Sequence, residues 1–139
     1  SWYTEGTEVI FACGGAVGNS VMSAAEAIDG KKVIGVDVDQ SSESDTVITS
    51  AMKGLSSAVQ QTLDEYYKDK FPGGQSLTLG ADKDGVKLPM DTSKFEKFTK
   101  EDYDKVYKEL ADGKIKLQKD DVKNATDLDV SAVSVQVVK

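Results

Sequence analysis

Four residues able to hold a small polar ligand each stand at the end of a short apolar run in this 139-residue chain. They are Gly14, Gly15, Asp37 and Lys53. Glycine lets backbone N–H groups approach a ligand closely, a carboxylate accepts hydrogen bonds, and an ammonium group donates them. The apolar runs are typical of parallel strands, and ligands bind beyond the carboxyl ends of such strands. We therefore expect these residues to lie at one edge of a sheet.

The glycine pair opens a predicted helix, where free N–H groups can bind a phosphate or a hydroxyl. The acids Asp37 and Asp39 follow about twenty residues later, as in the dinucleotide fingerprint, but Cys13 occupies the position of its first glycine. Glycines that only end a strand and allow a helix to start are more common than a cofactor site. Backbone contact to an uncharged ligand fits the pair equally well.

Asp37 follows four apolar residues at the end of a predicted strand. Its carboxylate suits the paired hydroxyls of a sugar or ribose, and the alternative is a cap on the following turn. We expect Asp39 to be the more solvated acid. Lys53 ends the third predicted strand among small and apolar neighbours. This position makes it a better candidate for ligand binding than an ordinary surface lysine.

Catalysis has little support in this composition. The chain contains no histidine, which removes the commonest general base and the commonest metal ligand. Cys13 therefore lacks the usual base of a cysteine nucleophile, and we expect a small, half-buried hydrophobic side chain there. The acids Asp82 and Asp84 lack the later glutamate of a calcium loop and indicate a turn. We expect no enzyme activity, no cofactor and no metal.

Periodicity predicts alternating strands and helices, hence an α/β fold with a mostly parallel sheet. The expected strands are residues 9–12, 32–36, 46–52, 76–80, 85–88 and 130–138, with 76–80 and 85–88 forming a hairpin. Three helices are expected. The first is capped by Asn19 or Ser20 and ends near Ile28, and the second runs from about 54 to 70. The third runs from the capping box of Thr99 and Asp102 to about Asp112. The tyrosines at 66, 67, 103 and 107 have helical spacing and are expected in the core or on its flank.

Composition bounds the class of partner. Hydrophobic residues make up 39% of the chain and the net charge is −7, so nucleic acid and anionic membrane surfaces are poor candidates. The length fits one domain. Residues 1–6 resemble the last helical turn before a glycine cap, which leads us to expect a fragment of a longer protein.

Three stretches resemble the basic membrane protein family, the purine-nucleoside receptors of ABC transporters. They are Gly6-Thr-Glu-Val-Ile-Phe-Ala-Cys-Gly-Gly15, Ile34-Gly-Val-Asp-Val-Asp-Gln40 and Val47-Ile-Thr-Ser-Ala-Met-Lys53. The resemblance implies a type I periplasmic-binding-protein architecture, with two Rossmann-like, three-layer α/β lobes hinged around a nucleoside. Residues 1–118 would be the C-terminal lobe, with 119–139 as a tail of the same domain.

The resemblance also implies roles. Asp37 and Lys53 would bind the ribose, with backbone at Gly14 and Gly15, while the residues that stack on the base would lie before Ser1. The parent would be an extracytoplasmic, membrane-anchored lipoprotein that serves an ABC permease, and the isolated lobe would bind nucleoside weakly and self-associate through its exposed cleft. The alternatives are a domain of an NAD(P)-dependent oxidoreductase and the sugar-sensing lobe of a transcription regulator.

Overall fold

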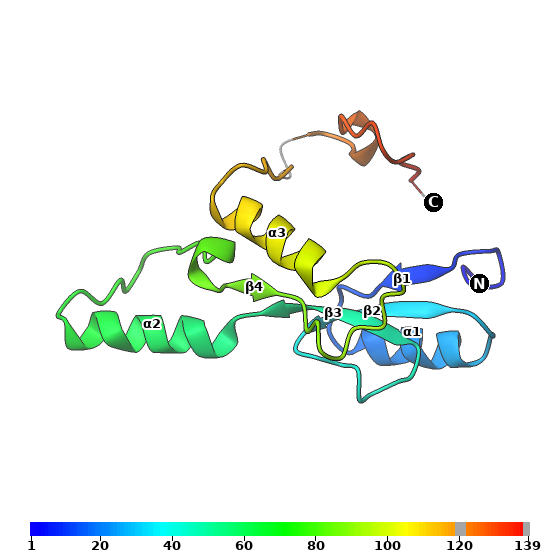
Figure 1. Ribbon diagram of the computed structural model, residues 1–139, viewed down its shortest axis with the longest axis horizontal. Helices are drawn as coiled ribbons and strands as arrows, with labels where there is room; N and C mark the ends of the chain where they lie inside the picture. Colours follow the sequence, from blue (N-terminus) through cyan, green and yellow to red (C-terminus); the bar gives the residue numbers. More distant parts are fainter. Residues whose placement is uncertain (119–121, 138–139) are drawn as a thin grey trace.

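The computed structural model describes residues 1–118 and 122–137 and contains a four-stranded sheet in the order β1-β2-β3-β4. Strands β1 (Val9–Phe11), β2 (Lys32–Asp37) and β3 (Val47–Lys53) are parallel, and β4 (Val86–Lys87) pairs antiparallel with β3 (Figure 1). Each of the three parallel strands contains valine and isoleucine, which are typical of strands. The predicted α/β fold with a mostly parallel sheet is confirmed.

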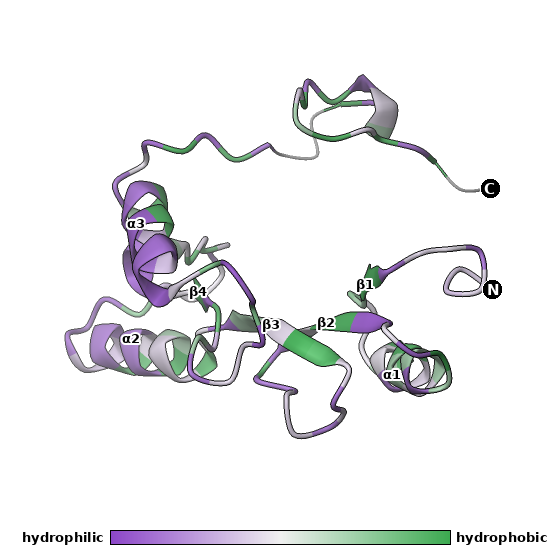
Figure 2. Ribbon diagram, turned by 45° about the vertical axis from the view of Figure 1, so that its right-hand side comes forward, coloured by the Kyte–Doolittle hydropathy of each residue, from purple (hydrophilic) through white to green (hydrophobic). Residues whose placement is uncertain are grey.

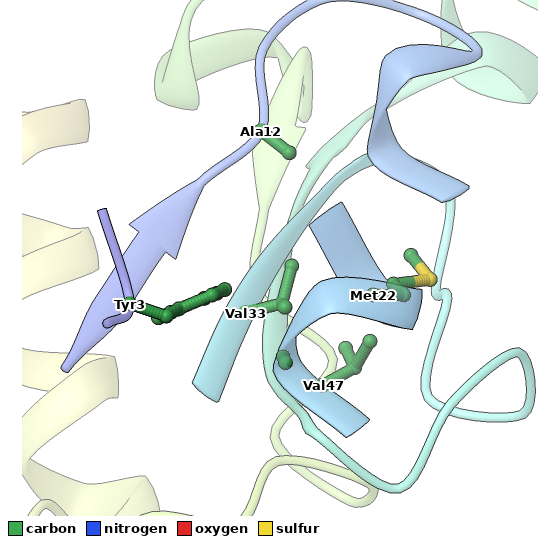
Figure 3. Packing of buried hydrophobic residues seen from close by; sticks show 6 residues of the cluster. Tyr3, Ala12, Met22, Val33 and Val47 are labelled. Atoms are coloured by element: carbon green, nitrogen blue, oxygen red, sulfur yellow. The ribbon is translucent and has the colours of Figure 1, made fainter. Parts of the chain in front are cut away.

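Helix α1 (Val17–Glu26) covers one face of the sheet, and α3 (Lys100–Ala111) lies on the other side, which gives three layers (Figures 1 and 2). The core lies between α1 and the sheet (Figure 3). Its buried hydrophobic residues are Tyr3, Ala12, Met22, Ala25, Val33 and Val47. Val33 and Val47 are fully buried, so these two strand residues centre the core.

Helix α1 begins earlier than predicted, at Val17, and Ala16 precedes it without any side-chain cap. Gly15 explains the early start, because its φ of +61° turns the chain directly from the strand end into the helix. Helix α3 begins where predicted. The Thr99 side chain accepts from the Asp102 N–H and the Asp102 carboxylate accepts from the Thr99 N–H, which completes the capping box.

Helix α2 (Leu55–Tyr67) follows β3 after a single residue and extends beyond the end of the sheet (Figure 1). It ends at Tyr67, before the predicted end at residue 70. Asp69, two residues further on, has a positive φ of 56°. Its apolar residues keep the predicted helical period, but none of the helix is buried. Tyr66 and Tyr67 are 59% and 80% exposed, so of the two predicted positions, core or flank, the core is excluded for them.

The hairpin predicted for residues 76–88 is wrong. Residues 76–80 form no strand, Ala81–Lys83 form a 3-10 helix (η1), and β4 pairs with β3 instead. The segment 80–85 is closed by a hydrogen bond from the Gly85 N–H to the Gly80 carbonyl at 2.9 Å. Strand β4 thus pairs with the open edge of β3. Residues 76–80, the partner that their closeness in the sequence predicted, do not pair with it.

The strand predicted for residues 130–138 is absent over 130–137, and position 138 lies outside the described residues. Val133 and Val137 are 63% and 64% exposed, because the described tail finds no sheet on which to pack the apolar side of its alternation. A short 3-10 helix, η2 (Ala125–Asp127), precedes this segment. Within residues 1–118 and 122–137, no helix has the length and apolar character of a membrane span.

Candidate functional site

The carboxyl ends of the parallel strands meet at one rim of a groove between the sheet and α3. The groove has a volume of about 670 Å³. All four predicted ligand residues line it, together with Cys13. Its apolar wall comes from the strands and from α3, and consists of Phe11, Val36, Ala51, Met52, Val86, Leu88, Phe98, Tyr103, Val106, Tyr107 and Leu110.

Asp37 and Lys53 form an ion pair across neighbouring strands at this rim. The Lys53 Nζ lies 2.7 Å from the Asp37 Oδ1, and the side chains are 65% and 47% exposed. Asp37 is the last residue of β2 and has a φ of +69°, a left-handed conformation that Asp tolerates better than most residues. The hydrogen bond to Asp37 and its negative charge raise the pKa of Lys53, so the lysine is charged at neutral pH.

The glycine pair connects β1 to α1. A Cβ on Gly14 would lie 2.6 Å from the Cγ1 of Val17, so a larger residue would force the Val17 side chain at the start of the helix to move. Gly15 needs its positive φ, which side chains rarely adopt. The pair therefore holds the amino end of α1 at the same rim as Asp37 and Lys53.

Cys13 is exposed and unpaired, so the prediction of a half-buried side chain is wrong. Phe11 and Cys13 point away from the core that Ile10 and Ala12 join, because strand residues alternate between faces. The groove side of β1 has no covering helix close enough to bury them.

Asp39, which we expected to be the more solvated acid, is engaged within the chain. Its Oδ2 accepts from the Thr92 hydroxyl at 2.7 Å and its Oδ1 accepts from the Ser41 N–H at 3.0 Å. Partial burial acts to raise the pKa of Asp39, but these hydrogen bonds outweigh it and lower the pKa below its ordinary value. Asp39 therefore anchors the loop after β2.

Gln40 has a structural role that sequence reasoning did not assign. The side-chain Oε1 of Gln40 accepts from the Val36 backbone N–H at 2.8 Å, and the backbone N–H of Gln40 donates to the Ser50 Oγ at 3.0 Å. A Cβ on Gly35 would lie 2.8 Å from that Oε1 and 2.7 Å from the Ser50 Oγ. Gly35, Gln40 and the fully buried Ser50 thus form a packed set beneath Asp37. The sequence signal for this packing was Gly35 itself, because a glycine inside a strand of β-branched residues often marks a close approach of other atoms.

The rim offers a carboxylate acceptor, an ammonium donor and a glycine turn beside an apolar wall. A mostly apolar groove with a few polar groups is typical of a small-molecule site. Over the described residues, no group of three or more Cys, Asp or Glu is arranged to hold a metal ion. The arrangement can bind and orient a small ligand with hydroxyl groups.

Comparison with known proteins gives a family and several relatives for this chain. Residues 1–126 match the Bmp family, described as ABC transporter substrate-binding protein PnrA-like. The chain is 32% identical over 130 residues to the ABC transporter nucleoside-binding protein BmpA of Lactococcus lactis, covering 81% of this chain and 36% of that protein. It is 30% identical over 133 residues to the CD4+ T-cell-stimulating antigen of Listeria monocytogenes, covering 84% and 37%.

Basic membrane protein D of Borreliella burgdorferi is 32% identical over 108 residues, which cover 76% of this chain and 30% of that protein. The chain thus spans about a third of the length of the curated relatives it matches. The family match extends over nearly all of the chain and includes every strand of the sheet. The chain belongs to the Bmp family of PnrA-like substrate-binding proteins of ABC transporters.

Proposed function

We propose that this chain forms one lobe of a longer receptor that captures a nucleoside, with a purine as the expected base, and delivers it to an ABC permease. The Asp37–Lys53 pair at the groove rim carries the proposal. The name of the Lactococcus lactis relative, a nucleoside-binding protein, supports the ligand class.

The chemistry of the pair suits a ribose. Two neighbouring hydroxyl groups can donate to the two oxygens of Asp37, while the ammonium group of Lys53 donates to a hydroxyl or ring oxygen. Both side chains remain about half exposed, so a ligand can reach them without breaking a buried contact. The glycine turn at the same rim lets the backbone approach an uncharged group closely.

The two alternatives have less support. An oxidoreductase would need the first glycine of the dinucleotide fingerprint, which is Cys13 here. Membership in a substrate-binding family favours a receptor over an enzyme or a transcription regulator. We further infer that the receptor works outside the cytoplasm, held to the membrane by a lipid anchor.

Isothermal titration tests the proposal with a polypeptide that contains this chain and has the length of its relatives. We expect binding of at least one nucleoside, with a purine preferred over a pyrimidine. Clear binding of an unrelated solute, without binding of any nucleoside, would contradict the proposal.

A further inference from the structure

Asp37 occupies the centre of a strained three-residue turn at the groove rim. The Val38 N–H donates to the Val36 carbonyl at 2.8 Å, and the φ of Asp37 between them is +69°. This is the rare form of γ-turn, in which the central residue has a positive φ. Strained backbone conformations persist only where the surrounding structure holds them. The turn therefore needs support from neighbouring residues.

Gln40 supports the first residue of this turn from the side of β1. Alternate N–H groups of β2 face β1, which ends at Phe11, opposite Ile34. The N–H of Val36 is the next in this series and lies beyond the end of β1. The Gln40 Oε1 accepts from it at 2.8 Å, so the side chain supplies the acceptor that β1 would provide if it continued. Without Gln40, a partly buried N–H directly before Asp37 would lose its partner.

Gln40 also binds the strand that carries Lys53. Its backbone N–H donates at 3.0 Å to the Oγ of Ser50, a fully buried residue of β3 that lies three positions before Lys53. Gly35 lies opposite Ser50 in the sheet, and its lack of a side chain leaves the space that Gln40 occupies. A single residue therefore contacts both of the strands from which the ion pair extends.

We propose that Gln40 is a positioning residue of the ligand site, which holds Asp37 in its strained turn and thereby sets how the carboxylate meets the ligand. The inference rests on the proposed function. The φ of Asp37 fixes the direction in which its side chain leaves the backbone, and in this turn its Oδ1 lies 2.7 Å from the Lys53 Nζ. A binding site needs its polar groups held to within about 0.5 Å by supporting residues, and Gln40 is such a support.

The test removes the acceptor of Gln40 in the longer protein and restores it in a second variant. Gln40→Met keeps the length of the side chain and puts a methyl group in place of the terminal amide. It should weaken ribonucleoside binding about fivefold or more and reduce the preference over the 2′-deoxy analogue, as isothermal titration measures. The Gln40 Nε2 donates to the Glu43 Oε2 at 3.3 Å. The double variant Gln40→Glu with Glu43→Gln exchanges these two side chains, keeps an acceptor at position 40, and should restore both properties.

Ser44→Ala is the matched control. Ser44 lies in the same connection between β2 and β3, but at the amino end of β3, away from the rim. Its Oγ accepts from the Thr46 N–H at 3.2 Å and donates to the Glu26 Oε1 at 2.7 Å, so this variant also removes a side-chain acceptor from a backbone N–H. Ser44→Ala should lower Tm, but it should leave the ratio of the ribonucleoside and deoxynucleoside affinities unchanged. A purely structural role of Gln40 predicts the same unchanged ratio for Gln40→Met.

NMR backbone couplings of Asp37 in the 139-residue chain give a second readout, which needs no ligand. They should report a positive φ in the unmodified chain and in the double variant, and the loss of that positive φ in Gln40→Met. A positive φ that persists in Gln40→Met, or an affinity ratio that stays at the unmodified value, would overturn the inference. If the unmodified longer protein binds no nucleoside while the couplings change as expected, only the proposed function fails, and Gln40 still positions Asp37.

Discussion

The Asp37–Lys53 pair depends on packed residues beneath it. Gly35 leaves the space in which Gln40 and Ser50 meet, and Gln40 holds the Val36 N–H next to Asp37. The position of the carboxylate is therefore set by packing inside the lobe. This arrangement explains how an exposed acid can have a defined geometry at the rim.

Gly35→Ala should destabilise the chain. The added methyl group would overlap the Ser50 Oγ and the Gln40 Oε1, and overpacking of this kind costs about 1–3 kcal/mol. Chemical denaturation followed by Trp2 fluorescence measures the change. Gly18→Ala is the matched control, because its Cβ would meet only the Ala12 Cβ at 4.0 Å. Equal stability of the two variants would show that the Gly35 contacts are not needed.

Lys53 gives the site a defined pH dependence. Its pKa is raised above the ordinary 10.5 by the hydrogen bond and charge of Asp37. A raised lysine pKa means that the ion pair is complete below the ordinary value and is lost as pH rises through the folded-state pKa. Nucleoside affinity of the longer protein should stay constant from about pH 6 to about pH 9 and fall only in stronger base. Titration at several pH values checks this, and a loss near pH 8 would contradict it.

The capping box of α3 shows how one element controls the groove wall. Helix α3 supplies Tyr103 and Tyr107, whose hydroxyl groups bind the chain at β4 and just after it. Tyr107 donates to the Val86 carbonyl, and Tyr103 accepts from the N–H of Leu88, which follows the strand. The cap at Thr99 fixes the start of this helix, and with it the side of the groove opposite the rim.

Thr99→Ala should cost about 1 kcal/mol of stability, because it leaves a first-turn N–H without its acceptor. Thermal unfolding of the 139-residue chain measures the loss. Thr99→Ser keeps the hydroxyl acceptor and should unfold near the temperature of the unmodified chain. An unchanged Tm for Thr99→Ala would show that α3 does not need its cap.

Elements with strong local signals were predictable from the sequence. Strands β1 to β3, the cap of α3 and the four residues at the rim follow from apolar runs, a Thr-x-x-Asp box and the ends of strands. The pairing of β4 with β3 was not predictable. Whether β4 pairs with β3 or with the nearby residues 76–80 is decided by contacts between residues far apart in the sequence. The exposure of Cys13 and Tyr67 was missed because periodicity does not show whether a covering element exists.

At the scale of the whole molecule, the proposed receptor would draw only part of its contact surface for the ligand from this chain. The 139-residue chain should fold, since α1 and the sheet have their own core, but it should bind nucleoside at least about tenfold more weakly than the longer protein. The base would lack its stacking partner, and stacking is worth roughly 1–3 kcal/mol per base. Parallel titrations of both lengths measure the difference. Equal affinities would show that the site lies wholly within this chain.

The most direct test of ribose binding by Asp37 uses titration of the longer protein with a purine nucleoside and its 2′-deoxy analogue. Asp37→Ala should weaken nucleoside binding by at least about tenfold, because hydrogen bonds to an ionised group are lost. It should also abolish the preference of the unmodified protein for ribose over deoxyribose. If Asp37→Ala keeps both the affinity and that preference, Asp37 only caps the turn after β2, and the assignment of the ribose site is wrong.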